Sequence, residues 1–499
     1  MTKKEQKMKT NALSLLVVST LLLTAACASE DTTGKQEQKQ ENKTDGLTTF
    51  VMPNTRATRT TAEYDGSGID FYWTEGDRLW VNNGTLIQDT KNNISSKLVP
   101  NPTTPTAVKR AATASFSFAG NYTAPNYPVR YTGKNSTTGD KVTIKAQQNQ
   151  TTPNDASHLG ESGDCGTATA HKTYTAEGVD YRFTLDHKAS YLTLLPYSTI
   201  NFSAYVKLTQ IKITADEALS GQFNFDDSGI DLGSRPAPTP TNRSITLTLN
   251  GGGTNGFKLP IAAKKEDNAS VIVLPPGTYH NVTIEYSVYD QYTTKSFTFK
   301  REYPTLALTA GKNKKISTDL KQIKVYYAPA SWWVATRGPN TNEALWYVQR
   351  GDPHLDLTAV YAARRGATAA SNPASICSGG VWFKKSTKIP GFATWTAPDG
   401  TNKVGYNNNS NYFSYSTSLP KGIPANIDDY FFAPSVLCPT DNDSRIASGN
   451  GRLLCWCSTK YEYNGTVGQT IYVSLTPSPT IGLSGEFYHT ELPYFYEYQ

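Results

Sequence analysis

Short runs of β-branched and aromatic residues recur along most of this chain, and turn residues separate them. Ile69–Trp73 is followed by a turn signal at Glu75-Gly76-Asp77, after which Leu79–Val81 resumes the pattern. Alternating runs bounded by Gly, Asn and Pro indicate half-buried strands joined by tight turns. Similar runs occupy Lys141–Lys145, Tyr181–Leu185, Tyr191–Leu195, Val206–Ile213, Ile245–Leu249, Ser270–Leu274, Val282–Tyr289 and Ser296–Lys300. This spacing predicts β-sandwiches rather than βαβ units.

The composition changes near residue 325. Residues 325–499 hold six of the eight tryptophans and four of the six cysteines. Within them, Leu355–Arg365 has apolar residues at helical spacing and ends at Gly366, so we expect a helix there. The chain is therefore expected to be mainly β, with a smaller α+β domain over residues 325–499. Its 499 residues suffice for two to four domains.

The first residues have the layout of an export signal. Four lysines precede an apolar run that ends at Leu23, and small residues then lead to Cys27. This run is shorter than the roughly 20 apolar residues that span a bilayer as a helix. The stretch resembles the lipobox of bacterial lipoproteins, which implies a signal peptide over residues 1–26 and a lipid on Cys27. The alternative is an ordinary signal cut elsewhere, with Cys27 incidental.

Residues 27–46 contain no large apolar residue and are expected to form a disordered tether. Leu47–Met52 has strand-forming residues and stops at Pro53. The polar segment after it contains Arg56 and Arg59 and has the character of an exposed, protease-accessible loop.

The remaining cysteines favour disulfides over a metal site. In an exported protein, clustered cysteines are expected to pair with one another. A zinc site needs suitable ligand spacing, and no histidine lies near this cluster except His489. The candidates are Cys377, Cys438, Cys455 and Cys457. We expect no cofactor and no metal. Residues 1–26 carry +3 of the formal charge of +6, and no run of Lys or Arg stands out, so we expect no nucleic-acid partner.

No residue pattern indicates catalysis. His187 follows Asp186, but no Gly-x-Ser-x-Gly motif accompanies it, and a lone histidine is usually a packed or surface residue. Asp226-Asp227 is expected to lie in a turn rather than to form the opposed carboxylates of a glycosidase. The chain is therefore not expected to be an enzyme.

Several blocks of the sequence resemble the fimbrillin family of Bacteroidales, including its Mfa-like members. They are the lipobox, the segment Thr55–Thr60, Phe71–Val81, Asp186–Leu192 and Leu274–Tyr279, which together cover roughly residues 20 to 325. The resemblance implies two tandem transthyretin-like β-sandwiches, over residues 47–187 and 188–324. It also implies a lipoprotein precursor at the outer membrane that an Arg-specific protease cuts.

Carried onto this sequence, the removable strand is residues 47–52, and the cut follows Arg56 or Arg59. Loss of this strand leaves a groove with unpaired backbone groups in the first sandwich. A strand from another fimbrial subunit then fills that groove, because an open sheet edge favours strand addition. The alternative for both arginines is a solvated loop that is not processed.

The segment Asp428–Pro434, followed by Gly451–Thr459, resembles the core of C-type-lectin-like domains on bacterial surface proteins. This implies a lectin-like adhesive domain over residues 325–499, which binds a host or bacterial surface glycan or protein. Aromatic faces could serve such contacts, and the candidates are Trp332, Trp333, Trp382 and Trp395. No clear set of calcium-binding carboxylates accompanies them.

The hypothesis that follows is a fimbrial accessory subunit at the tip. It reaches the outer membrane as a lipid-anchored precursor and ends in an extracellular fimbrium that mediates cell adhesion. Shaft subunits of the family end soon after the second sandwich with a donated strand, whereas this chain continues for about 175 residues. The alternative is a static surface lipoprotein that binds glycans and does not polymerise. A secreted hydrolase would be a third possibility, and no site supports it.

Overall fold

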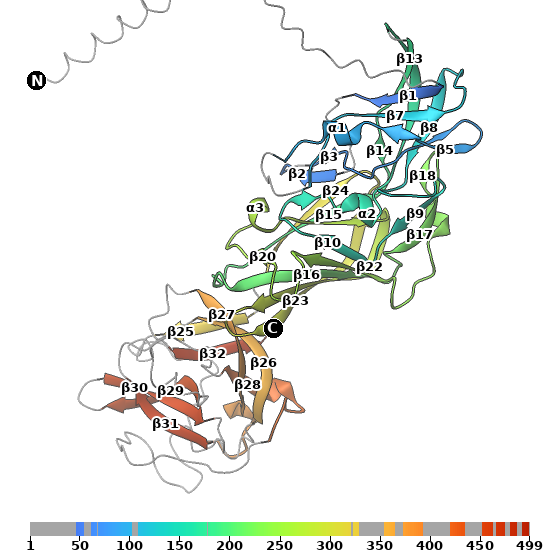
Figure 1. Ribbon diagram of the computed structural model, residues 1–499. Coiled ribbons are helices and arrows are strands. Elements are labelled where there is room, and N and C mark those ends of the chain that lie inside the picture. The colour runs from blue at the N-terminus through green and yellow to red at the C-terminus, as the bar shows by residue number, and fades with distance from the viewer. Residues whose placement is uncertain are drawn as a thin grey trace, which may run out of the picture. The chain divides into compact units, whose positions relative to one another are not determined.

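The computed structural model describes residues 46–53, 61–66, 68–101, 108–176, 178–320, 323–328, 354–364, 373–392, 420–434, 452–462, 466–474, 480–486 and 492–498. Strands dominate these residues, and the helices among them have three or four residues each (Figure 1). The expectation of a mainly β chain is therefore confirmed.

A nine-stranded sheet contains most strands of the first part of the chain. Its order is β5-β4-β8-β12-β13-β1-β7-β6, and β14 pairs with β12. The strands are β1 (Leu47–Met52), β4 (Trp80–Asn82), β5 (Leu86–Gln88), β6 (Lys91–Asn92), β7 (Ala114–Ala119), β8 (Asn126–Tyr131), β12 (Gly166–Thr175), β13 (Gly178–Arg182) and β14 (Asp186–His187). A core that includes Phe50, Trp73, Phe116 and Tyr131 packs with these strands.

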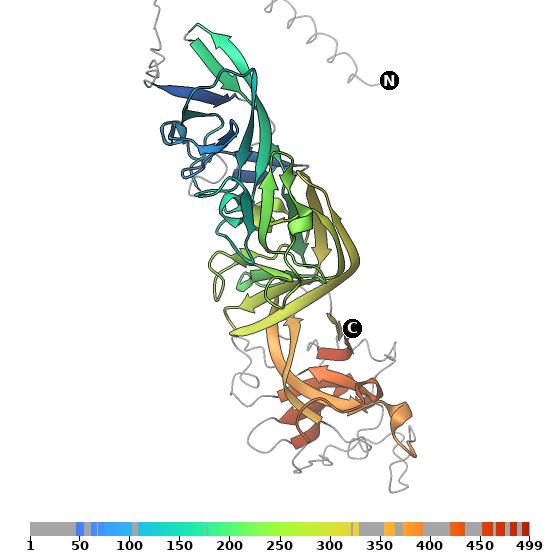
Figure 2. The ribbon, with the colours of Figure 1, turned by 90° about the vertical axis from the view of Figure 1, so that its right-hand side faces the viewer.

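A second group of strands surrounds a larger core. One sheet has the order β10-β19-β16-β22-β23, with β20 on β16, and another has the order β21-β15-β24. The strands are β10 (Gln147–Gln150), β15 (Ser190–Tyr197), β16 (Val206–Thr214), β19 (Ser244–Leu249), β20 (Phe257–Lys258), β21 (Ser270–Leu274), β22 (Gly277–Asp290), β23 (Lys295–Leu308) and β24 (Asn313–Asp319). The β22–β23 hairpin is long and curved in both views (Figures 1 and 2).

Smaller elements complete these two groups. The sheet β18-β17-β9 joins β9 (Lys141–Ile144), β17 (Gly221–Asp226) and β18 (Gly229–Ile230), and the sheet β11-β2-β3 joins β2 (Thr61–Tyr64), β3 (Ile69–Tyr72) and β11 (Asp155–Ala156). The short helices are α1 (Ile94–Lys97), α2 (Leu159–Ser162), α3 (Lys265–Asn268) and η1 (Leu232–Ser234).

Two strands from the expected first sandwich pair with strands of the expected second one. β9 pairs antiparallel with β17, and β10 pairs parallel with β19. Val142 and Ile144 accordingly belong to the larger core, with Leu192 and Ile211 among its members. Residues 141–150 thus contribute to sheets formed mainly by residues 188–319.

Buried glutamines connect the sheet of β10 to that of β21. Gln148 donates to the carbonyl of Val273 over 2.9 Å and accepts the amide of Val273 over 3.2 Å. Gln150 accepts the amide of Val271 over 2.9 Å and donates to the carbonyl of Ala269 over 2.8 Å. Gln148 thus pairs both backbone groups of Val273 in β21, and Gln150 pairs the amide of Val271 and the carbonyl of Ala269, the residue before β21. Buried backbone groups of this kind are costly when they are left unpaired.

The regular elements in the described part of residues 323–498 are strands and two short 3₁₀ turns. β25 (Ile323–Ala328) pairs with β32 (Leu492–Tyr498). Two further sheets contain β26 (His354–Arg364), β27 (Ala374–Lys384) and β28 (Tyr430–Pro434), and β29 (Arg452–Glu462), β30 (Thr466–Ser474) and β31 (Thr480–Glu486). The turns are η4 (Ser386–Lys388) and η5 (Ile427–Asp429).

The expected helix at Leu355–Arg365 is wrong, because residues 354–364 form β26 and pair antiparallel with β27. Leu357, Val360 and Tyr361 would share one face of a helix, whereas Leu355, Leu357 and Tyr361 would share one face of a strand. Over so short a run both patterns are present, and pairing with a neighbouring strand decides in favour of β structure. The α+β character expected for this region rested on that helix, and its described residues contain no α-helix.

Candidate functional site: the groove that holds β1

The strand β1 lies inside the nine-stranded sheet, between β13 and β7. It runs parallel to β13, with Thr49 opposite Asp180 and Val51 opposite Arg182. The amide of Phe183 donates to the carbonyl of Val51 over 3.1 Å. The expected strand at Leu47–Met52 is confirmed with the same bounds. Because β1 has a neighbour on each side, its removal would leave two unpaired backbone edges and an empty slot between them.

The second half of β1 has one fully buried face. Phe50 and Met52 have no exposed surface, whereas Thr49 and Val51 are half-buried. This alternation follows from the period of two in a strand, which sends successive side chains to opposite faces. The two apolar side chains therefore anchor β1 in the core, and the backbone sets its register.

Phe50 sits in a pocket of aromatic rings, which we call the Phe50 pocket. Its ring stacks on Tyr181, with 4.8 Å between centroids and 15° between planes. Phe118, Tyr122 and Tyr127 meet it edge-on at 5.0, 5.3 and 6.4 Å. Stacked and edge-to-face pairs each contribute about 0.5–1.5 kcal/mol beyond the burial of their area. The pocket therefore matches a flat ring better than an aliphatic side chain.

The walls of the Phe50 pocket are held together by bonds that do not involve β1. The hydroxyl of Tyr181 donates to the carbonyls of Tyr122 and Ala124, over 2.9 and 2.8 Å. The hydroxyl of Tyr127 accepts the amides of Thr123 and Ala124, over 2.9 and 3.0 Å. Burial raises the pKa of Tyr181, which keeps its hydroxyl protonated as a donor. These bonds fix the segment between β7 and β8 as one side of the pocket.

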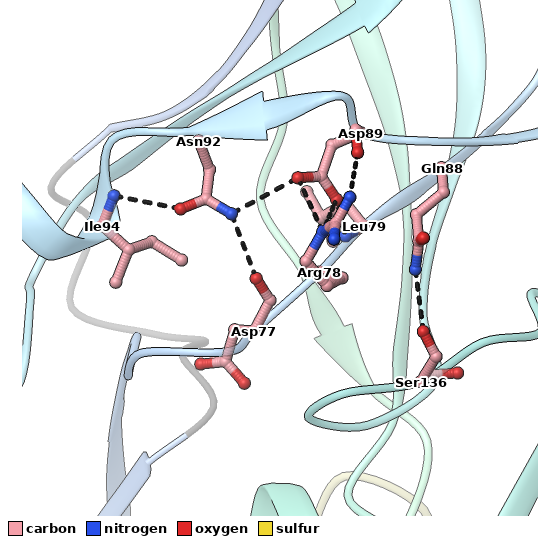
Figure 3. Close-up of polar contacts among 8 residues, drawn as sticks. All are labelled: Asp77, Arg78, Leu79, Gln88, Asp89, Asn92, Ile94 and Ser136. Atoms are coloured by element: carbon pink, nitrogen blue, oxygen red, sulfur yellow. Dashed lines mark hydrogen bonds and ion pairs between the residues drawn. The ribbon is translucent and has the colours of Figure 1, made fainter.

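The end of the block Phe71–Val81, which carries part of the family resemblance, is bound by two polar residues that follow it, Asp89 and Asn92 (Figure 3). The buried carboxylate of Asp89 accepts the amide of Leu79 over 2.8 Å and Nε of Arg78 over 2.9 Å. The side chain of Asn92 donates to Asp89 and to the carbonyl of Asp77, both over 3.3 Å. A charged group buried in this way must be paired. The block is thus a structural element of the sheet that receives β1, and its polar groups serve the fold.

His187 is buried and packed, as expected. It has 5% exposure, its Nδ1 lies 2.9 Å from a carboxylate oxygen of Asp164, and its ring stacks on Phe71 at 3.8 Å. The Tyr191 hydroxyl also contacts Asp164, and burial raises the pKa of Tyr191 well above its usual value. These contacts are those of a packed core histidine.

Most other residues expected at sites lie outside the described residues or have only their backbone described. Cys27, Arg56, Arg59, Trp332, Trp333, Trp395 and Cys438 belong to the first group, and Cys377, Cys455 and Cys457 belong to the second, in β27 and β29. Trp382 is described and only 3% exposed, so its ring faces the interior.

Where the structure is described, Cys165 is a buried free thiol, and no three metal-ligating side chains gather. Among the same residues, no helix has the length and apolar character needed to cross a membrane.

The sequence identified β1 but not the Phe50 pocket. Tyr122 and Tyr127 are close together in the sequence, but Tyr181 lies in β13 and reaches them only because β13 pairs with β12 and β12 pairs with β8. Asn126–Tyr131 alternates in the manner of a strand and could have been recognised. Its contribution to a pocket for Phe50 has no local signal.

No protein-family model matches the chain, and no curated protein matches it either. Solved structures that it resembles include a protein provisionally assigned to cell adhesion from Bacteroides ovatus, with 15% identity, a TM-score of 0.27, and coverage of 55% of this chain and 92% of that one. A second, from Bacteroides uniformis with the same assignment, has 14% identity, a TM-score of 0.27, and coverage of 55% and 95%. A fimbrial protein from Bacteroides ovatus has 10% identity, a TM-score of 0.23, and coverage of 90% and 99%. These values do not by themselves assign a family or a function.

Proposed function

We propose that this chain is a fimbrial accessory subunit that matures by losing β1 and joins its neighbours by strand exchange. It reaches the outer membrane as a precursor lipidated on Cys27, and an Arg-specific protease cuts it after Arg56 or Arg59. The mature protein is part of an extracellular fimbrium and mediates adhesion. The role is one of assembly and binding, without catalysis.

The observation that carries the proposal is the position of β1. It is a six-residue strand in the interior of a sheet, and a short polar segment with two arginines follows it directly. A cut in that segment would separate β1 from the rest of the chain and leave it held by noncovalent contacts alone. Its departure would expose an apolar slot with unpaired edges, which a strand of another subunit can fill.

A tip position is supported by β25. In shaft subunits of the family that the sequence resembles, the chain ends soon after the second sandwich with a donated strand. At the corresponding place here, β25 pairs antiparallel with β32, from Ile323 opposite Tyr498 to Ala328 opposite Leu492. A strand paired within its own chain is not free to fill a neighbour's groove. Residues 325–499 then form the lectin-like adhesive domain, which binds a surface glycan or protein.

Processing is tested by the intact mass of the chain isolated from its native cells. We expect the wild-type protein to begin at Ala57 or Thr60. A double variant with Arg56→Lys and Arg59→Lys keeps both charges but removes the Arg-specific site, and we expect it to begin at acylated Cys27. A wild-type chain that begins at Cys27 and is never cut contradicts strand exchange and favours a static glycan-binding lipoprotein.

The tip position is tested by immunogold labelling of isolated fimbriae with an antibody against residues 325–499. Labels confined to fibre ends support it. Labels spread along the shaft contradict it without affecting the processing result.

A further inference from the structure

We propose that the Phe50 pocket selects the strand that replaces β1, and that the partner must present a phenylalanine-sized aromatic ring there. The partner segment is extended and carries an apolar side chain two residues after the ring, where Met52 is now fully buried. This inference rests on the proposed strand exchange and adds the chemistry by which one strand is accepted over another.

The backbone of the groove requires an extended partner. Three residue pairs link β1 to β13, from Thr49 opposite Asp180 to Val51 opposite Arg182, and the amide of Phe183 extends the ladder. The backbone groups of β13 can pair with any sequence in strand conformation, because main-chain hydrogen bonds do not depend on the side chains of the partner. Selection must therefore come from the pockets on the buried face, which are those of Phe50 and Met52.

The Phe50 pocket distinguishes an aromatic ring from an aliphatic side chain. Tyr181 offers a nearly coplanar face at 4.8 Å, and three more rings approach from the sides. A leucine in this position would lose the stacked face and leave gaps along the edges, and an alanine would leave a cavity. A polar side chain would be buried without a partner.

The pocket is organised before the ring arrives. The hydroxyl groups of Tyr181 and Tyr127 bind the backbone of residues 122–124, and none of these bonds reaches β1. Gly120 allows the turn that begins this segment, since its φ of +116° lies in the left-handed region. A preformed pocket pays less ordering entropy when its ligand binds, so it can discriminate sharply between side chains.

Peptide exchange into the full-length chain tests the selection. A site for a sequence-specific protease is placed within residues 54–60, the purified chain is cut, and fluorescent peptides with the sequence of residues 46–53 are added in excess. The variants are Phe50→Leu, Phe50→Ala and, as a control on the outward face, Val51→Ala. Fluorescence anisotropy gives the relative affinities by competition, and the uncut chain serves as the blank.

We expect the native and Val51→Ala peptides to bind within about fivefold of each other. The Phe50→Leu peptide should bind about tenfold more weakly, given the energy of aromatic pairs, and the Phe50→Ala peptide about 100-fold or more, given the usual effect of removing a buried ring. Equal binding of all four peptides overturns the selection and leaves strand exchange intact. If the native peptide fails to enter the cut chain, strand exchange itself fails and the selection fails with it.

A second variant separates a preformed pocket from an induced one. Tyr181→Phe keeps the ring that stacks on Phe50 but removes the hydroxyl that binds Tyr122 and Ala124. We expect it to reduce the ratio between the native and Phe50→Leu peptides while both still bind. An unchanged ratio contradicts preorganisation by this hydroxyl.

Discussion

Substituting Phe50 by alanine in the uncut chain is the most direct test of how β1 is held. The ring is fully buried and touches four other aromatic rings, so the change removes a large side chain from a site that its neighbours cannot easily fill. Substitutions of this kind typically lower the free energy of unfolding by about 3–5 kcal/mol. We expect a value near the lower end, about 3 kcal/mol, because β1 is short and its backbone bonds remain.

Scanning calorimetry measures this effect on the transition of the nine-stranded sheet. A loss of about 3 kcal/mol in a domain of 150–250 residues corresponds to roughly 6–12 °C in Tm. Val51→Ala is the matched control, since Val51 lies on the same strand with its side chain half-exposed, and it should shift Tm by no more than about 2–4 °C. Equal shifts for the two variants would show that the Phe50 pocket does not anchor β1 and would refute the reasoning.

Three further predictions concern the framework around the groove. Gln148→Glu should lower the free energy of unfolding in urea by about 2–4 kcal/mol, because the new carboxylate would face the carbonyl of Val273. The control is Gln147→Glu, on the exposed face of the same strand, which should change this free energy by less than about 0.5 kcal/mol. Gly76→Ala should cost about 1–3 kcal/mol by the same measurement, because φ is +89° and a Cβ would lie 2.6 Å from a neighbouring amide oxygen. His158, whose Nε2 lies 3.0 Å from a backbone carbonyl, has its pKa lowered to about 4 by burial. On acidification the unfolded chain takes up a proton on His158 near pH 6.5, before the folded chain does. The free energy of unfolding is therefore highest above pH 6.5 and falls as the pH drops towards 4. In unfolding measured at several pH values, His158→Gln should reduce this fall by on the order of 2 kcal/mol.

The sequence predicted strands well where apolar residues alternate. Ser270–Leu274 was expected and forms β21 with the same bounds, and Val206–Ile213 forms β16 with one more residue. In such segments the β-branched residues and the alternation of apolar and polar positions are enough to predict a strand from the local sequence. Leu47–Met52 belongs to this class, and so the central element of the candidate site could be found without the structure.

Elements that depend on distant partners were not predictable. Gln147–Gln150 is entirely polar, yet it forms β10, because its backbone pairs with β19 about 100 residues away and two of its side chains bind Val273 and Ala269. The segment Leu355–Arg365 contains one set of apolar residues at helical spacing and another at a spacing of two, so its sequence favours a helix and only the pairing with β27 decides for a strand. The Phe50 pocket has the same origin, since its rings meet only after three strands have paired.

The parallel pairing of β1 with β13 also has a mechanical consequence. Tension applied along the axis of a strand in this slot loads the hydrogen bonds of both edges in shear, so they share the force and must yield together. A hairpin pulled open from its end yields one bond at a time. The Phe50 ring adds resistance, because it has to leave its enclosure before the strand can slide by the two residues that restore the inward pattern. A strand held in this way would withstand pulling along its own axis far better than peeling away from the sheet.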